Sequence, residues 1–186
     1  MSHSERNGTR PIPLNVEIKA ILRDRERVEK TVARLTDVPP QLIAQEDHFF
    51  CCDEARLKLR ILAPASGELI RYERANAAEI RSSRYLIART ADPAIMLEIL
   101  AMTLGKAGVV RKERTLYLVG QTRVHLDRVL DLGDFLELEV VLRPEQSHEE
   151  GKRIADALLS SLEINRSDLV GEAYVDLLAR RTESIS

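Results

Sequence analysis

Charged side chains at every second position are the feature of this sequence that could do chemistry. In the segment Arg56–Ile61, three cationic residues alternate with three aliphatic residues. Successive side chains of a β-strand point to opposite faces, so a strand here would present Arg56, Lys58 and Arg60 on a single face. Such a face either binds anions such as phosphate or is simply solvated, and for one strand alone the solvated face is the more common case.

Polar faces recur along the chain, and they bring carboxylates as well as cations. The side chains that share a face within their own segment are Asn15, Glu17 and Lys19; Arg123, His125 and Asp127; and Glu137 and Glu139. Lys112 and Arg114 also share a face, but Arg111 and Glu113 charge the opposite one, so the period alone does not choose between them. If the apolar sides pack against helices, the polar sides either face water or enclose a wet lumen, since eight strands can close around a ligand.

A mixture of carboxylates and cations on neighbouring strands suits a metal-bound polyphosphate. Mg²⁺ and Mn²⁺ take carboxylate oxygens, whereas polyphosphate takes lysine ammonium and bidentate arginine groups. Glu137 and Glu139, together with Glu17, could hold a metal ion that bridges phosphate oxygens, and the cations would then neutralise the charge that develops during phosphoryl transfer. A Glu-x-Glu pair is a weak signal by itself, because many solvated strand faces contain one.

The elements that must position these residues are short alternating segments interrupted by four helical patterns. Strands are predicted at 14–22, 45–51, 56–62, 68–74, 83–89, 109–118, 122–129 and 135–142. Helices are predicted from about Asp24 to Leu35, between Asp92 and Gly105, after the capping box Ser147–Glu150, and after a cap at Ser167 or Asp168. Their apolar stripes, which include Ile99 and Tyr174, are expected to pack in the core rather than to bind a ligand.

Composition limits the class of protein and its partners. The chain has 186 residues, a formal net charge of −2 and 4% aromatic residues, which predict one globular domain with no overall attraction to nucleic acid or to an anionic membrane. No apolar run approaches the roughly 20 residues of a membrane helix, and the first 13 residues lack a signal-peptide hydrophobic region. Cys51 and Cys52 are adjacent and therefore poorly placed for an ordinary disulfide. We expect a cytoplasmic protein with a flexible tail at 1–13, a domain at 14–181 and a short tail at 182–186.

These residues carry a resemblance to a known family. The run Asn15-Val16-Glu17-Ile18-Lys19 resembles the N-terminal Glu-x-Glu-x-Lys signature of the CYTH superfamily, the triphosphate tunnel metalloenzymes, with asparagine in place of the first glutamate. The segments that resemble the later basic strands and the closing Leu-Gly-x-Phe-x-Glu-x-Glu strand of that family are 56–60, 111–114, 125–127 and 132–139. The resemblance covers about residues 14–180.

The resemblance implies an α+β fold, an eight-stranded antiparallel β barrel with flanking helices whose tunnel holds a triphosphate and Mg²⁺ or Mn²⁺. The phosphate ligands that it implies are Lys19, Lys58, Arg60, Lys112 and Arg114, with Arg56, Arg74 and Arg123 as further candidates. The metal ligands that it implies are Glu17, Glu137 and Glu139, with the uncharged amide of Asn15 in place of a carboxylate. The candidates for a catalytic role are Lys19, Asp127 and His125. At Arg74 the assignment stays open, because Arg71 and Glu73 compete for the inward phase of that strand.

Two reactions suit such a tunnel, and a third interpretation involves no reaction. A triphosphatase would hydrolyse inorganic tripolyphosphate, thiamine triphosphate or a nucleotide, whereas a class IV adenylyl cyclase would convert ATP to cyclic AMP and pyrophosphate. The third interpretation is a protein that binds polyphosphate without turning it over. We expect triphosphate hydrolysis, with a small-molecule triphosphate as the partner, no nucleic acid or membrane partner, and a homodimer as an open alternative to a monomer.

Overall fold

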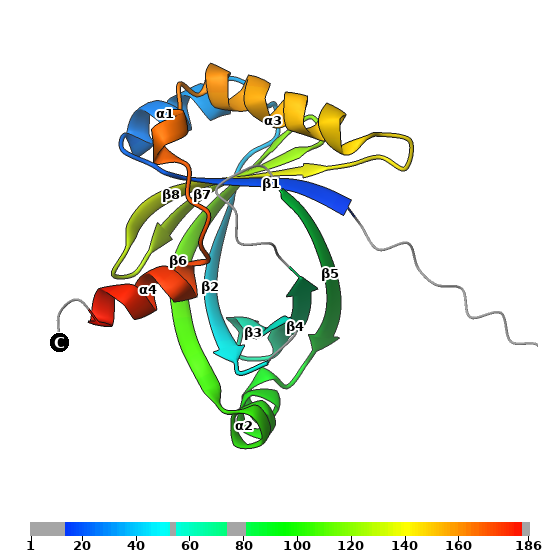
Figure 1. Ribbon diagram of the computed structural model, residues 1–186, viewed down its shortest axis with the longest axis vertical. Helices are drawn as coiled ribbons and strands as arrows, with labels where there is room; N and C mark the ends of the chain where they lie inside the picture. Colours follow the sequence, from blue (N-terminus) through cyan, green and yellow to red (C-terminus); the bar gives the residue numbers. More distant parts are fainter. Residues whose placement is uncertain (1–13, 53–54, 74–80, 184–186) are drawn as a thin grey trace, which may run out of the picture.

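The computed structural model describes residues 14–52, 55–73 and 81–183, and in this part of the chain eight antiparallel strands form one closed barrel (Figure 1). The strands are β1 (Leu14–Ile21), β2 (Gln41–Phe50), β3 (Arg56–Ala63), β4 (Ser66–Glu73), β5 (Arg81–Thr90), β6 (Lys106–Val119), β7 (Thr122–Val129) and β8 (Gly133–Val141). Their order around the barrel is β1-β5-β4-β3-β2-β6-β7-β8. The ring closes through β1, because this strand pairs with β5 on one side and with β8 on the other.

Most neighbouring strands are consecutive in the chain, and short turns of two or three residues join β3 to β4, β6 to β7 and β7 to β8. Gly120 lies between β6 and β7 with φ at 57°, and Gly133 begins β8 with φ at 101°, conformations that favour glycine. All eight predicted strands are confirmed, with shifts at their ends. The largest shift is in β2, which begins at Gln41 rather than at Gln45 and pairs with β6 from that point.

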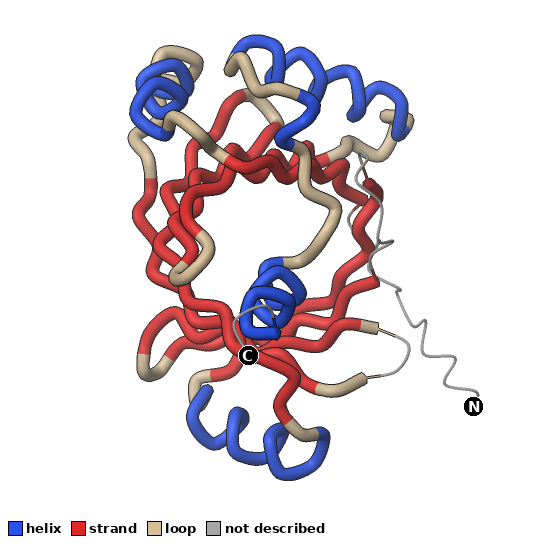
Figure 2. The backbone as a smooth tube through the Cα atoms, turned by 60° about the vertical axis from the view of Figure 1, so that its left-hand side comes forward, coloured by secondary structure: helices blue, strands red, loops and turns tan. Residues whose placement is uncertain are grey.

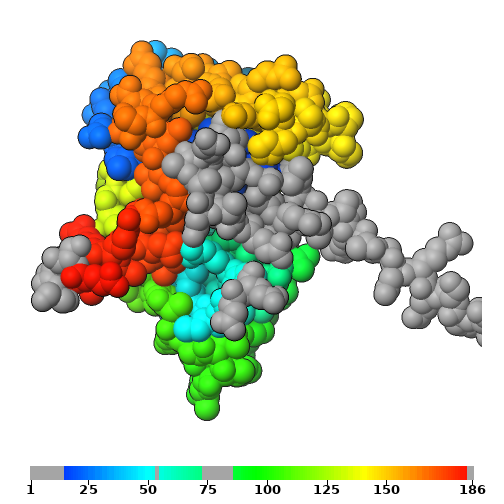
Figure 3. Space-filling view, in the orientation of Figure 1, coloured from blue at the N-terminus to red at the C-terminus, as the bar shows by residue number. Residues whose placement is uncertain are grey.

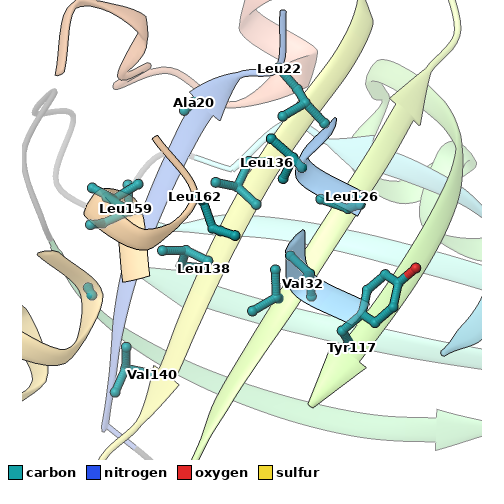
Figure 4. Close-up of a cluster of buried hydrophobic side chains, with 14 of the residues drawn as sticks. Ala20, Leu22, Val32, Tyr117, Leu126, Leu136, Leu138, Val140, Leu159 and Leu162 are labelled. Carbon is teal, nitrogen blue, oxygen red and sulfur yellow. The ribbon is translucent and has the colours of Figure 1, made fainter. Parts of the chain in front are cut away.

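The main hydrophobic core lies outside the barrel, between the strands and two helices. The helices α1 (Arg25–Ala33) and α3 (His148–Ser161) cover the outer face of β1, β6, β7 and β8 (Figures 1 and 4). Leu126, Leu136 and Leu138 from the strands meet Val32 and Leu162 there without exposure to solvent. Because these outward positions are apolar, the alternating polar side chains of the same strands point into the barrel.

The other two helices lie away from this core. The helix α4 (Tyr174–Glu183) lies at one end of the barrel, as the view in Figure 2 shows, and Tyr174 packs there in a second buried cluster with Phe49 and Phe135. The helix α2 (Pro93–Leu104) buries only Pro93 among its residues. The prediction that its apolar stripe packs in the core is wrong at Ile99, which is 54% exposed. The helix lies outside the barrel wall against β2, β3 and β4, at the bottom of Figure 1, and no other described element covers its outer side.

The fourth helix begins later than predicted. Ser167 and Asp168 lie in a short 3₁₀ helix, Arg166–Asp168, and not at the start of α4. The chain then runs extended along β1, where Leu169 bridges Ala20 and the Val170 N–H donates to the Lys19 carbonyl at 2.9 Å. In Figure 3 this connection, in orange, runs down the side of the barrel from α3 to α4. It therefore ties the position of α4 to the strand that carries Lys19.

The predicted tails stay a prediction. Residues 1–13 and 184–186 lie outside the described residues, and α4 continues through Glu183, past the predicted domain end at 181. Cys51 and Cys52 are both exposed free thiols, in agreement with the expectation of no disulfide between them. Among the helices of the described ranges, none is long and apolar enough to cross a membrane.

Candidate functional site

The barrel encloses a cavity of about 600 Å³ that is lined by inward side chains from all eight strands. Its charged lining residues are Glu17, Lys19, Asp47, Lys58, Arg60, Glu68, Arg89, Lys112, Arg114, Arg123, Glu137 and Glu139. Ala173 and Tyr174, at the start of α4, line the cavity at one end. The strict alternation of the strands therefore brings most of the predicted site residues into one enclosed space.

Two of the cavity's cations are held by an aspartate on the neighbouring strand. Lys58 and Arg60 lie on β3, and Asp47 lies on β2 directly across from Arg60. The Lys58 Nζ donates to Asp47 Oδ2 at 2.6 Å, and the Arg60 Nε donates to Oδ1 at 2.9 Å. All three side chains are largely buried, so the aspartate fixes both cations in place with charge-assisted hydrogen bonds.

The same arrangement is repeated on β6 and β7. Arg114 lies directly across from Asp127, and its Nε donates to Asp127 Oδ1 at 2.6 Å, while Lys112 Nζ donates to Oδ2 at 2.8 Å. The Tyr174 hydroxyl donates to the same Oδ2 at 3.2 Å. Asp127 is fully buried behind these donors, so it positions cations and does not itself face the cavity. The lysine–arginine pair is thus presented twice, once on each side of β2.

Glu137 connects the second of these groups to β1. It accepts from Arg114 Nη2 at 2.5 Å, and Lys19 Nζ lies 3.4 Å from its other oxygen. Lys19 also stacks over the Tyr174 ring, with its Nζ 3.8 Å from the ring centroid. His125 lines the cavity beside them, with Nδ1 3.9 Å from a Glu137 oxygen. Arg114 is therefore shared between two carboxylates, one buried behind it and one facing the cavity.

The end of the cavity away from α4 opens towards solvent. Arg123, whose side chain is 43% exposed, donates to Glu139 at 3.1 Å, and the Asn15 side-chain amide donates to the same carboxylate. Glu17 on β1 is the direct cross-strand neighbour of Glu139 on β8. Two carboxylates thus face each other across this pair of strands, with Glu137 two residues further into the barrel.

Burial and neighbouring charges set the protonation states of these groups. Burial, together with the adjacent positive charge of Arg60, lowers the pKa of Lys58 to about 7, although Asp47 opposes the shift. Burial alone would raise the pKa of the Asp127 carboxyl, but Arg114 and Lys112 outweigh it and lower the pKa to about 2. Burial and the charge of Arg114 hold the pKa of His125 well below its usual range, so its imidazole is neutral. One lysine of the site therefore titrates near neutral pH, whereas Asp127 stays ionised.

A family model described as the CYTH domain matches residues 13–174, which is most of the chain. The chain belongs to the CYTH family. Members of this family are triphosphatases or cyclases, and they generally use divalent metal ions. The resemblance seen in the sequence is confirmed by this match.

Solved structures share the fold of this CYTH protein at low sequence identity. A protein of Pyrococcus horikoshii is 23% identical with a TM-score of 0.78, covering 88% of this chain and 98% of that one. A candidate adenylate cyclase of Vibrio parahaemolyticus is 17% identical with a TM-score of 0.72, covering 89% and 98%. A candidate adenylyl cyclase of Hippeastrum, described as having a dominant triphosphatase activity, is 15% identical with a TM-score of 0.62, covering 92% and 96%. A search of curated proteins finds no match.

The predicted metal ligands of this CYTH protein do not form a metal site as the structure stands. Glu17, Glu137 and Glu139 supply oxygens of the right chemistry for Mg²⁺ or Mn²⁺, but Glu137 is paired with Arg114 and Glu139 with Arg123 and Asn15. Within residues 14–52, 55–73 and 81–183, no three histidine, cysteine, aspartate or glutamate side chains converge to hold a metal ion. Metal binding by these residues stays a prediction.

One predicted phosphate ligand, Arg56, does not line the cavity, and another, Arg74, cannot be placed because it is outside the described residues. Arg56 has the inward phase, but it lies at the end of β3, and its guanidinium donates to both oxygens of Asp176 in α4 at 3.0 and 2.6 Å. On β6 the structure places Lys112 and Arg114 inside and Arg111 outside, where Arg111 pairs with Glu46.

Sequence reasoning missed two residues that shape the CYTH site. Asp47 holds Lys58 and Arg60, but the prediction of a strand at 45–51 gave this residue no role in the site. The sequence did contain a signal, because Gln45, Asp47 and Phe49 stand at every second position and therefore share one face of the strand. Tyr174 was predicted to pack in the core of a helix–sheet layer. It does pack against Phe135, with ring centroids 5.0 Å apart, but its other face meets Lys19 and lines the cavity.

Proposed function

We propose that this CYTH protein binds the triphosphate chain of a small molecule in its cavity and hydrolyses it. The supporting observation is the repeated unit in which one buried aspartate presents a lysine and an arginine to the cavity. In the part of the chain that the structure describes, the cavity is lined by seven lysine and arginine side chains against five carboxylates, and Asp127 lies behind the lining as a sixth. The cations nearest to the two units are Lys19, Lys58, Arg60, Lys112 and Arg114. This excess of positive charge in a buried space favours a polyanion, because ligand charge would compensate what the protein leaves unbalanced.

Arg114 is the residue best placed to exchange a contact within the protein for a contact with the ligand. Its guanidinium already binds Asp127 through two nitrogens, so it stays anchored when its contact with Glu137 is exchanged for a phosphate oxygen. The cations then stabilise the charge that develops on the phosphoryl oxygens and on the leaving diphosphate. Positioning of this kind supplies most of the catalysis in phosphoryl transfer.

The released Glu137 carboxylate and the neutral His125 are the groups that would orient the attacking water. Both line the cavity, and their nearest atoms are 3.9 Å apart. Water would attack the terminal phosphorus, the bond to the bridging oxygen would break, and the proton of the water would pass to one of these two acceptors. The requirement for Mg²⁺ or Mn²⁺ is part of the proposal, supported by family membership and by the oxygen-rich set Glu17, Glu137 and Glu139.

The alternative reaction is cyclisation of ATP, and its support is the likeness to the Vibrio parahaemolyticus structure described as a candidate adenylate cyclase. In that reaction the ribose hydroxyl replaces water and attacks the α phosphorus. The third interpretation, binding without turnover, follows from the engagement of Glu137 and Glu139 by cations. The partner that we propose is a small-molecule triphosphate, and neither nucleic acid nor a membrane. The choice between a monomer and a homodimer stays open.

Product analysis tests the proposal. Purified protein is incubated with tripolyphosphate, thiamine triphosphate and ATP in the presence of Mg²⁺ or Mn²⁺, and the products are resolved. Orthophosphate without cyclic AMP is the expected result, whereas cyclic AMP with pyrophosphate would establish the cyclase instead. Lys58→Ala and Arg60→Ala should lose activity, with Arg111→Ala as the control, because Arg111 is a cation on the outer face of the same barrel. Binding with no product from any substrate would leave the third interpretation.

A further inference from the structure

One wall of the cavity is apolar where the rest is charged. The inward positions of β3, β4 and β5 include Leu62, Ile70 and Ile87, all of which line the cavity. Ile70 is the direct cross-strand partner of Ile87 on one side and of Lys58 on the other. Lys58, which we propose binds phosphate, therefore lies in one continuous row of side chains with Ile70 and Ile87. Ile70 is 6% exposed and Ile87 is 47% exposed, so the row leads from the interior towards solvent.

Aliphatic side chains also lie next to the second group of cations. Ile43 on β2 is the direct cross-strand partner of Arg114, and Leu116 on β6 lies across from His125. Both line the cavity. Lys58 on β3 and Arg114 on β6 thus each have an aliphatic side chain as a cross-strand neighbour.

Aliphatic lining of this kind does not serve a phosphate chain. Phosphate oxygens gain nothing from isoleucine and leucine, and the apolar surface of Ile87 that remains hydrated costs free energy unless a ligand covers it. Leu62, Ile70 and Ile87 belong to neither of the two buried clusters that the described residues form, the larger of which lies on the outer face of the barrel under α1 and α3. Ligand sites are commonly apolar surfaces with a few polar groups that fix orientation.

Glu68 supplies such a polar group beside the apolar wall. It lies on β4 across from Arg60 on one side and from Arg89 on the other, and its nearest contact with Arg89 is 3.9 Å. An ionised carboxylate accepts hydrogen bonds and cannot donate them. A ring that carries an amino group would therefore suit this edge of the wall better than a ring that carries a carbonyl.

We propose that the wall formed by Leu62, Ile70 and Ile87 binds the ring of an organic triphosphate whose phosphate chain occupies the cations of β3 and β6. The ring is an aromatic heterocycle with an amino group directed at Glu68. This inference rests on the proposed triphosphate site and narrows its substrate class, because inorganic tripolyphosphate has no group to cover the wall.

Ile87→Ala tests the wall, and Leu86→Ala is its matched control. Leu86 is the next residue on β5, is 57% exposed and points to the outer face, so it reports any general effect of shortening a side chain on this strand. Affinities for ATP, thiamine triphosphate and tripolyphosphate are measured by calorimetry in EDTA. At least one organic triphosphate should bind wild type as tightly as tripolyphosphate or more so. Ile87→Ala should weaken that ligand about fivefold and leave tripolyphosphate within twofold, whereas Leu86→Ala should change neither.

The outcomes separate this inference from the proposed function. Tight binding of tripolyphosphate with weak binding of both organic ligands would overturn the wall and keep the triphosphate site. Equal weakening of all ligands by Ile87→Ala, or no weakening of any, would likewise overturn it. Failure of all three ligands to bind wild type would overturn the proposed function itself.

Inosine triphosphate tests the part of the proposal that concerns Glu68. It has a carbonyl where ATP has an amino group, so wild type should prefer ATP. Glu68→Gln, which adds a donor at the same place, should reduce that preference by about fivefold or more. An unchanged ratio of the two affinities would show that Glu68 does not meet the ring.

Discussion

Replacing Lys58 by arginine would show whether a lysine that titrates near neutral pH meets the triphosphate. With a pKa of about 7, the Lys58 amine is about half deprotonated at pH 7 and about nine tenths deprotonated at pH 8. A bound polyanion raises this pKa, because nearby negative charge favours the charged form. Binding should therefore take up about half a proton through Lys58 at pH 7 and about nine tenths of a proton at pH 8.

Proton uptake is measured by titrating tripolyphosphate without metal in buffers of different ionisation enthalpy. The ligand and Lys112 contribute proton equilibria of their own, since burial and Arg114 also lower the pKa of Lys112. Arginine keeps the positive charge and does not titrate in this range, so the difference between wild type and Lys58→Arg isolates the single amine. Equal uptake by the two proteins at pH 8, with binding retained in both, would refute the reasoning that a Lys58 amine of lowered pKa meets the phosphate chain.

Four more outcomes are expected. The pKa of Lys58 is lower in the folded chain than in the unfolded one, so between about pH 7 and 10.5 the unfolded chain binds more protons. The free energy of unfolding, measured by urea denaturation, should therefore rise with pH in this range, by up to about 1.4 kcal/mol per pH unit more in wild type than in Lys58→Met. Arg114→Ala should weaken tripolyphosphate binding about a hundredfold by calorimetry, since it removes a charged bidentate donor; Arg111→Ala should stay within twofold, and similar losses in the two variants would contradict the inward assignment. EDTA should abolish orthophosphate release but not tripolyphosphate binding, and persistent turnover in EDTA would show that metal is not required. Gly151→Ala should lower Tm by several degrees, because the added Cβ would lie 2.6 Å from the Val16 side chain, and an unchanged Tm would mean that α3 shifts freely.

The strands and the shared face of most lining residues could be predicted because both depend on local alternation, whereas closure into a barrel was predicted only through the resemblance to the family. The period of two places Lys58 and Arg60 on one face whatever the rest of the fold does. The choice between Lys112–Arg114 and Arg111–Glu113 could not be made in this way, since both faces of β6 are charged. In the structure Arg111 lies on the outer face of the barrel, where it forms an ion pair with Glu46 of β2, and Lys112 and Arg114 therefore point inward.

The features that were missed depend on contacts between distant parts of the chain. Asp47 stands between Glu46 and His48, so three polar residues in a row hide the alternation around it. Arg56 has the correct phase, but its partner Asp176 comes from α4, which no local pattern places at the end of β3. Tyr174 belongs to an apolar helical stripe that looks the same whether the helix lies on a sheet or across a tunnel end. Ile99 belongs to a similar stripe whose second layer does not exist in the described chain.

The closure of the barrel through β1 has a consequence for how the protein folds. The first strand of the chain must pair with the last, which brings Lys19 beside Glu137, and contacts of such long sequence separation form slowly because a large loop must close first. A chain emerging from the ribosome cannot complete the site until β8 has been made. The two lysine–arginine units can form earlier, from β2 with β3 and from β6 with β7, so closure of the barrel would bring Lys19 to a site that is already partly built.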